Sequence, residues 1–215
     1  MVWDKTFYIP GFLFKPELRV LCIADTHSAF KVYHPEKPAL PGEIDAILLL
    51  GDIYEDDLFL IFQMFNGLPI YAVCGNHESP DMYTRHNVPV IHESTNAFIK
   101  NYTITGWSGT YCYKEGIPVS YDQKQGLQEE KRMPKADIFI SHDVPYKAYD
   151  KGLADSHPGL IGIRQYLEHR KCKLHIHGHI HDSGHITRIK GIPSMCIYTM
   201  AYIKICHGKV QVLSL

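Results

Sequence analysis

A run of histidines, HIHGHIH at residues 175–181, is the feature of this sequence that most clearly suggests chemistry. A further histidine, His185, follows it, and imidazole is the commonest metal ligand in proteins near neutral pH. The alternatives are a polar strand that happens to be rich in histidine and a histidine-rich tract that stores metal. A defined metal site needs further ligands from elsewhere in the chain, and the sequence contains candidates for them.

Small polar clusters follow five segments that have the apolar, β-branched character of buried strands. The carboxyl ends of strands in an open α/β sheet converge on one crevice, so clusters far apart in the sequence can meet there. Their Asp, Asn and His side chains, without any thiolate, suit Mn, Fe, Zn, Ni or Co and disfavour a sulfur-rich structural zinc site. The clusters are DTH (25–27), GD (51–52), GNHE (75–78), SHD (141–143) and GHIH (178–181).

The spacing within these clusters favours chelation of an ion. Asp25 and His27 are two residues apart, as are His179 and His181, and extended backbone with that spacing places both side chains on one face. Each pair could therefore bind one ion. In three of the clusters a glycine precedes the candidate ligand, and the missing Cβ allows the backbone to turn sharply and approach an ion or a phosphate.

Strands that alternate with helices must position these clusters. We expect buried strands at 19–25, 44–52, 68–77, 136–143 and 173–181. Helices are expected at 55–67 and 157–171, the latter opened by a proline, and over part of 120–133. Strands of a second sheet are expected at 88–93 and 98–109, followed over 185–215 by three or four antiparallel strands with turns at Lys190-Gly191 and His207-Gly208.

This pattern predicts a mixed α/β fold with layered sheets and helices. The aromatic-rich residues 1–18 are expected to form an N-terminal extension packed on the core, as an added hairpin that covers a sheet edge. Residues 19–215 then form the domain that carries the clusters.

Composition limits the classes of protein to which the chain can belong. Its 215 residues are 45% hydrophobic and 21% charged, as in a soluble globular protein, and the formal net charge of -1 argues against a strongly basic nucleic-acid footprint. Neither a signal peptide nor an apolar run long enough to span a bilayer is recognised, so no membrane partner is expected. The six cysteines form no C-x-x-C pair, and we predict that they are reduced and that the protein is cytoplasmic.

The five motifs, in this order, resemble those of the calcineurin-like metallophosphoesterase superfamily over about residues 19–205. One such motif alone is a weak signal, but five in order, each at a strand end, are specific. The resemblance implies a four-layer α/β/β/α sandwich and a centre of two divalent metal ions. With Asp52 bridging, it assigns Asp25, His27 and His181 to one ion and Asn76, His142 and His179 to the other.

The resemblance also implies that His77 is a catalytic histidine and not a ligand. Of the metals that suit these ligands, Mn is the one we expect. Two such ions would make hydroxide available between them, and this hydroxide would attack phosphorus. His77 would then donate a proton to the leaving oxygen. Glu78, Asp143 or Asp182 could orient imidazoles from behind, whereas His175 and His177 are expected to be structural or to support the ligands, and His185 to lie at the surface.

The substrate class is less well defined by the sequence. The stretch GDIYEDD (51–57) lacks the arginine of the phosphoprotein phosphatase signature, and the chain leaves no room for the cap of the recombination nucleases. These departures favour a small phosphodiesterase acting on a nucleotide or similar diester. A nuclease of the same superfamily and a non-catalytic scaffold remain the alternatives. His157 and Arg164 are candidates for substrate contacts, with ordinary solvated side chains as the other interpretation.

Overall fold

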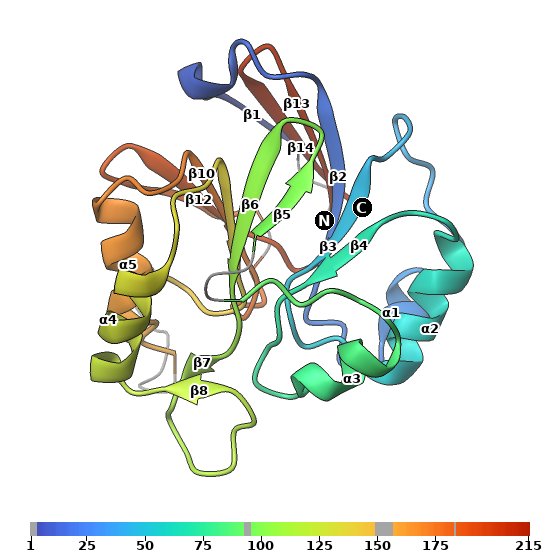
Figure 1. Cartoon of the computed structure of the whole chain (residues 1–215). Coiled ribbons are helices and arrows are strands. Elements are labelled where there is room, and N and C mark those ends of the chain that lie inside the picture. The colour runs from blue at the N-terminus through green and yellow to red at the C-terminus, as the bar shows by residue number, and fades with distance from the viewer. Residues whose placement is uncertain (1–3, 93–95, 149–156, 183) are drawn as a thin grey trace.

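Two six-stranded sheets pack face to face in the computed structural model, which describes residues 4–92, 96–148, 157–182 and 184–215 (Figure 1). The first sheet has the strand order β1 (Asp4–Tyr8), β14 (Lys209–Ser214), β13 (Thr199–Cys206), β2 (Leu18–Ala24), β3 (Ala46–Leu49) and β4 (Ile70–Ala72). The second has the order β11 (Ile186–Ile189), β12 (Ile192–Cys196), β10 (Leu174–His177), β9 (Ile138–Ser141), β6 (Tyr102–Trp107) and β5 (Asn96–Ile99).

Helices cover the outer faces of both sheets (Figure 1). The helices α1 (Phe30–Tyr33), α2 (Glu55–Met64) and α3 (Pro80–Arg85) lie on the first sheet, and α4 (Gln123–Arg132) and α5 (Ile161–Glu168) on the second. On β2, Val20 and Cys22 join the apolar cluster between the sheets, whereas Leu21 and Ile23 join the cluster under the helices. Successive strand side chains point to opposite faces, so burial of both faces requires continuous apolar runs. The predicted four-layer α/β/β/α sandwich is confirmed.

Local sequence explains where the longer helices begin and end. α2 starts with three acidic residues, which suit the positive end of the helix dipole, and ends just before the Asn66-Gly67 turn. α4 begins with a capping box in which Asp122 Oδ1 accepts the Gln125 N–H (2.7 Å) and Gln125 Oε1 accepts the Asp122 N–H (2.8 Å). Both helices lie within the ranges that the sequence predicts.

Parallel pairing in both sheets brings the predicted clusters together. In the first sheet β2, β3 and β4 run parallel, and in the second β6, β9, β10 and β12 run parallel. A small parallel pair, β7 (Thr110–Tyr111) and β8 (Ser120–Tyr121), follows β6. The strands that precede the five clusters therefore all deliver them at carboxyl ends, which is where a site is expected.

Three sequence-based boundaries are wrong. The segment 98–109 is not one strand, because β5 and β6 form a hairpin that turns at Lys100, where φ is 48°. The segment 88–92 forms only one bridge, from Val90 to Ala72, and residue 93 lies outside the described residues. The helix expected from residue 157 begins at Ile161, because Gly159 has a φ of 74° and Leu160 instead pairs with the backbone of Val144.

The carboxyl-terminal strands turn where the sequence predicts. Lys190-Gly191 and His207-Gly208 have left-handed φ values of 49°, 87°, 47° and 79°, as hairpin turns of this kind require. Not all of these strands are antiparallel to their neighbours, since β12 lies parallel to β10.

At the amino terminus β1 pairs with β14 as an edge strand, and the division of the chain at residue 18 stays a prediction. Within the described ranges, no helix has the length and apolarity that crossing a bilayer demands.

Candidate metal centre

Four of the predicted ligands adopt left-handed backbone conformations just beyond their strands. The φ angle is 54° at Asp25, 46° at His27, 56° at Asp52 and 70° at His179. Such conformations cost about 1–3 kcal/mol each in residues other than glycine and cluster at functional sites. The explanation that paired ligands converge because they lie on one face of extended backbone is therefore wrong. β2 and β10 end before these residues, and strained turns aim the side chains instead.

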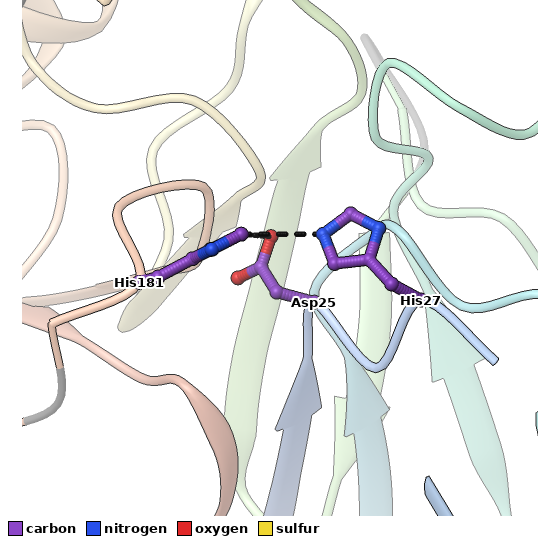
Figure 2. Close-up of side chains that lie close together, drawn as sticks. All are labelled: Asp25, His27 and His181. Atoms are coloured by element: carbon purple, nitrogen blue, oxygen red, sulfur yellow. Dashed lines mark hydrogen bonds and ion pairs between the residues drawn. The ribbon is translucent and has the colours of Figure 1, made fainter. Parts of the chain in front are cut away.

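The first group of converging side chains is Asp25, His27 and His181 (Figure 2). The Nε2 atoms of the two imidazoles are 3.2 Å apart, and His181 Nε2 lies 3.8 Å from Asp25 Oδ1. Asp25 Oδ2 accepts the N–H of His179 at 2.9 Å, but Oδ1 is buried without a hydrogen-bond partner. Leaving a buried carboxylate oxygen unpaired is costly, and a cation between these three groups would satisfy it.

The second group is centred on His142, whose ring is fully buried. Its Nδ1–H donates to the carbonyl oxygen of Leu50 at 2.8 Å. Burial lowers the pKa of His142, so the ring is neutral and Nε2 carries a lone pair. That lone pair faces Asn76 Oδ1 at 3.1 Å and Asp52 Oδ2 at 3.5 Å, and His179 Nδ1 is also 3.1 Å away. Acceptors that face one another at these distances fit the ligand shell of a cation.

Asp52 lies between the two groups. Its Oδ2 is 3.5 Å from His142 Nε2 and 3.7 Å from His27 Nε2, so one oxygen atom faces ligands of both groups. Its Oδ1 accepts the backbone N–H of Asn76 at 3.0 Å and of His77 at 3.1 Å. The carboxylate is thereby held in the position that a bridging ligand would occupy, and the donor set as a whole fits two divalent ions.

Two glycines allow the loops to approach this closely. A Cβ on Gly75 would collide with Asp52 Oδ1 and the Asp52 backbone, and a Cβ on Gly51 would collide with the ring of His142. Gly51 also has a φ of 92°, which side chains disfavour. The sequence-based expectation that glycines permit close approach at these positions agrees with these contacts.

Glu78 supports the centre in a way that the sequence did not indicate. Its Oε1 accepts the backbone N–H groups of Asp52 and Gly75, both at 2.9 Å, and the O–H of Tyr83 at 3.1 Å. Burial raises the pKa of Glu78 to about 8. The expectation that Glu78 orients an imidazole is wrong, because it ties together the two loops that present Asp52 and Asn76.

Asp143 is near an imidazole, as expected of a residue that orients a metal ligand. Its Oδ1 is 3.9 Å from His179 Nε2, while its carboxylate accepts the backbone N–H groups of Tyr111 and Val144, both at 2.8 Å. Asp182 is exposed to solvent.

His77 lies at the opening of the centre. Its Nε2 is 3.8 Å from Asp52 Oδ2, and its side chain is 41% exposed, compared with 0% for His142. A cavity of about 310 Å³ opens here, and its lining residues are His27, Asp52, Asn76, His77, Tyr113, His157, His179, Ile180 and His181. His77 is thus accessible to a substrate that occupies the cavity, and its assignment as a catalytic residue and not a ligand stays a prediction.

The two predicted substrate contacts differ in their positions. His157 lines the cavity, with its ring 4.7 Å from the ring of His179. Arg164 does not line it: the guanidinium donates to Glu168 at 2.8 Å and to the carbonyl of Tyr146 at 3.0 Å. Tyr113 also lines the cavity but could not be predicted, because it lies in a loop outside all five motifs and carries no local signal.

Known proteins resemble this chain in sequence and in fold. The family model for calcineurin-like phosphoesterases matches residues 18–183. No curated protein is similar enough in sequence to match the chain. A solved structure from Thermus thermophilus is 18% identical with a TM-score of 0.59, covering 92% of this chain and 98% of that one.

Two further solved structures show the same likeness. The phosphopantetheinyl hydrolase of Mycobacterium tuberculosis is 13% identical, with a TM-score of 0.58 over 85% of this chain and 90% of that one. A dimetal phosphatase of Danio rerio is 12% identical, with a TM-score of 0.55 over 87% and 92%. At such identities the structural likeness concerns the fold alone.

Proposed function

Because the chain belongs to the calcineurin-like phosphoesterase family of metal-dependent phosphoester hydrolases, we propose that it hydrolyses phosphodiesters, with a nucleotide or similar diester as substrate and Mn²⁺ as the metal. The observation that carries the proposal is the lone pair of His142 Nε2, which faces Asn76 Oδ1 at 3.1 Å and Asp52 Oδ2 at 3.5 Å. This arrangement of acceptors is unfavourable without a cation and favourable with one.

The side chains divide into two sets of ligands around Asp52. When bound, the two ions supply Lewis-acid chemistry, since they make water more acidic and bind phosphate oxygens. The backbone N–H groups of Asn76 and His77 hold Asp52 in place for this role. The proposed ligands are Asp25, His27 and His181 for one ion and Asn76, His142 and His179 for the other, with Asp52 bound to both.

His77 is the proposed proton donor to the leaving oxygen. Its imidazole is partly exposed beside the cavity, and its backbone N–H is fixed by Asp52 at 3.1 Å. A donor in this position neutralises the alkoxide as the phosphorus–oxygen bond breaks. General acid catalysis of this kind typically contributes about 10²–10⁴-fold to the rate.

The charge of the cavity favours diesters over monoesters. None of the described residues that line it is lysine or arginine. Arg164, the cation that the sequence suggested, is bound to Glu168. A phosphomonoester carries about -1.5 to -2 charges near pH 7, as phosphorylated side chains do, and a diester carries only one. A site whose cations are the metal ions alone matches the smaller charge better.

A diester and a monoester that release the same leaving group, p-nitrophenolate, test the proposal. The wild-type protein with Mn²⁺ is expected to hydrolyse bis(p-nitrophenyl) phosphate faster than p-nitrophenyl phosphate, and a chelator should abolish both activities. A faster rate on the monoester would contradict the diester preference. Absence of chelator-sensitive hydrolysis would instead indicate a scaffold.

The variant His77→Ala tests the proton donor. On a 2′,3′-cyclic nucleotide, whose leaving group is an alkoxide, it should lose about 10²–10⁴-fold in kcat. On bis(p-nitrophenyl) phosphate it should lose much less, because nitrophenolate needs no proton, and its Mn²⁺ content should not change. His185→Ala removes an exposed histidine outside the cavity lining and serves as the control. Equal losses on both substrates would exclude His77 as the acid.

A further inference from the structure

Tyr113 occupies the wall of the cavity next to the second group of ligands. It follows the short strand β7, is half-buried, and lines the cavity together with Asn76 and His77. Its phenol oxygen lies 3.5 Å from Asn76 Nδ2. The only hydroxyl group among the described residues that line this cavity is therefore placed beside a proposed metal ligand.

Ring contacts hold Tyr113 in this orientation. Its ring stacks on the imidazole of His157, with 6.2 Å between centroids and 28° between planes, and His157 in turn packs at 4.7 Å on His179. The ammonium of Lys114 lies 5.4 Å from the centre of the Tyr113 ring. The phenol is thus anchored independently of its oxygen atom, so removal of the hydroxyl need not move the ring.

The hydrogen bonds around Asn76 determine what the phenol proton can do. The Asn76 amide presents Oδ1 to His142 Nε2 and Nδ2 to Tyr113. Because Nδ2 can only donate, the Tyr113 oxygen is the acceptor in this contact, and its own O–H must point elsewhere. Within the described ranges no acceptor for that O–H is found among the hydrogen bonds of Tyr113.

We infer that Tyr113 is a substrate-binding residue, whose O–H donates to a non-bridging oxygen of the phosphoryl group in the cavity. This inference rests on the proposed function for the identity of the substrate, but only a bound phosphate is needed to form the contact. Loss of a hydrogen bond to a charged group typically weakens binding about tenfold or more. The described lining of the cavity contains no lysine or arginine, so the Tyr113 hydroxyl provides a hydrogen-bond donor that such side chains do not provide here.

Calorimetric titration of Mn²⁺-loaded protein with inorganic phosphate tests the inference without any turnover. Tyr113→Phe keeps the ring and its stacking on His157, and it should bind phosphate about tenfold more weakly, the lower part of the range for such a hydrogen bond. The matched control is Tyr111→Phe, which removes a hydroxyl from β7, where the ring packs in the cluster under α4 and α5 and lies outside the cavity lining. The control should bind phosphate like the wild type.

Two further measurements separate the contact with substrate from other roles. Mn²⁺ affinity of Tyr113→Phe in the absence of phosphate should stay within twofold of wild type, and KM for bis(p-nitrophenyl) phosphate should rise more than kcat falls. Unchanged phosphate affinity, or a tenfold loss of Mn²⁺ affinity, overturns the inference. If the wild type binds phosphate through Tyr113 but hydrolyses no ester, the proposed function fails and this inference stands.

Discussion

The two halves of the HIHGHIH run have different environments, although they share residue type and spacing. His175 and His177 lie within β10 and are fully buried. His179 and His181 follow Gly178, beyond the end of the strand, and both line the cavity. The second half contacts the other proposed metal ligands: His179 lies 3.1 Å from His142, and His181 lies 3.2 Å from His27.

The hydrogen bonds of the imidazoles account for this difference. His175 Nε2 and Nδ1 are each 2.8 Å from a hydroxyl, those of Ser141 and Ser194 on the two neighbouring strands. A ring whose two nitrogens already have partners has no lone pair left for a metal. Among the described residues His179 has one side-chain hydrogen-bonding partner, His142, whose Nε2 lies 3.1 Å from His179 Nδ1, so one nitrogen of the His179 ring stays available to a cation. The partners of a histidine, and not its spacing, therefore decide whether it can be a ligand.

We expect the strongest loss of metal binding from a change to His179, which follows Gly178 and lines the cavity. His179→Ala should remove a metal ligand, and since loss of residues that merely support ligands costs about 10–100-fold in metal affinity or activity, the loss here should exceed about 100-fold. Mn²⁺ binding by calorimetry measures it, with circular dichroism to show that the fold is intact. His185→Ala, which removes a histidine just beyond the run, is the control. Normal Mn²⁺ binding in the His179 variant would remove the basis of the comparison.

A smaller effect is expected from His175, which lies within β10: its loss should lower the stability of the fold without affecting metal binding. His175→Ala should leave Mn²⁺ stoichiometry unchanged but lower the free energy of unfolding of the metal-free protein by about 3 kcal/mol, because it leaves a buried cavity and removes the partner of the Ser194 hydroxyl. Urea denaturation in the presence of a chelator measures this change. A stoichiometric loss of Mn²⁺ would show that the ligands had been assigned to the wrong half of the run.

The smallest effect is a dependence of stability on pH. Burial lowers the pKa of His175 well below its ordinary value, so the unfolded chain takes up a proton below about pH 6.5 that the folded protein does not. The stability linked to His175 is therefore present above that pH and is lost as the pH falls toward the folded pKa, by at most about 1.4 kcal/mol per pH unit. His175→Gln should show a shallower loss than wild type between pH 7 and 5 when both are metal-free. Equal slopes would mean that His175 is charged in the folded protein.

Much of the fold could be predicted because local sequence encodes it. Apolar runs indicated strands buried on both faces, and Lys190-Gly191 and His207-Gly208 marked their turns correctly. Errors arose where local signals were ambiguous: the break between β5 and β6 at Lys100 and the late start of α5 after Gly159 depend on backbone pairing with other segments. Strand propensity alone cannot resolve such boundaries.

The candidate site could be predicted only in part. The motifs placed seven proposed ligands at strand ends, and the structure brings all of them together. It does not bring Arg164 to the cavity, because Glu168, one helical turn further along α5, binds the guanidinium. Tyr113 was missed because its position depends on β7 and β8, a pair of two-residue strands too short to give a sequence signal.

The chemical groups available at the site follow from the amino-acid sequence: carboxylates, an amide and imidazoles placed after apolar strands, with glycines beside them. How these groups face one another depends on tertiary contacts, including the left-handed turns at Asp25 and Asp52 and the bond from His142 to Leu50. Residue types and local propensities are properties of neighbours in the chain. The direction of a lone pair is set by partners that only sheet pairing brings near, such as Leu50 and His142, 92 residues apart.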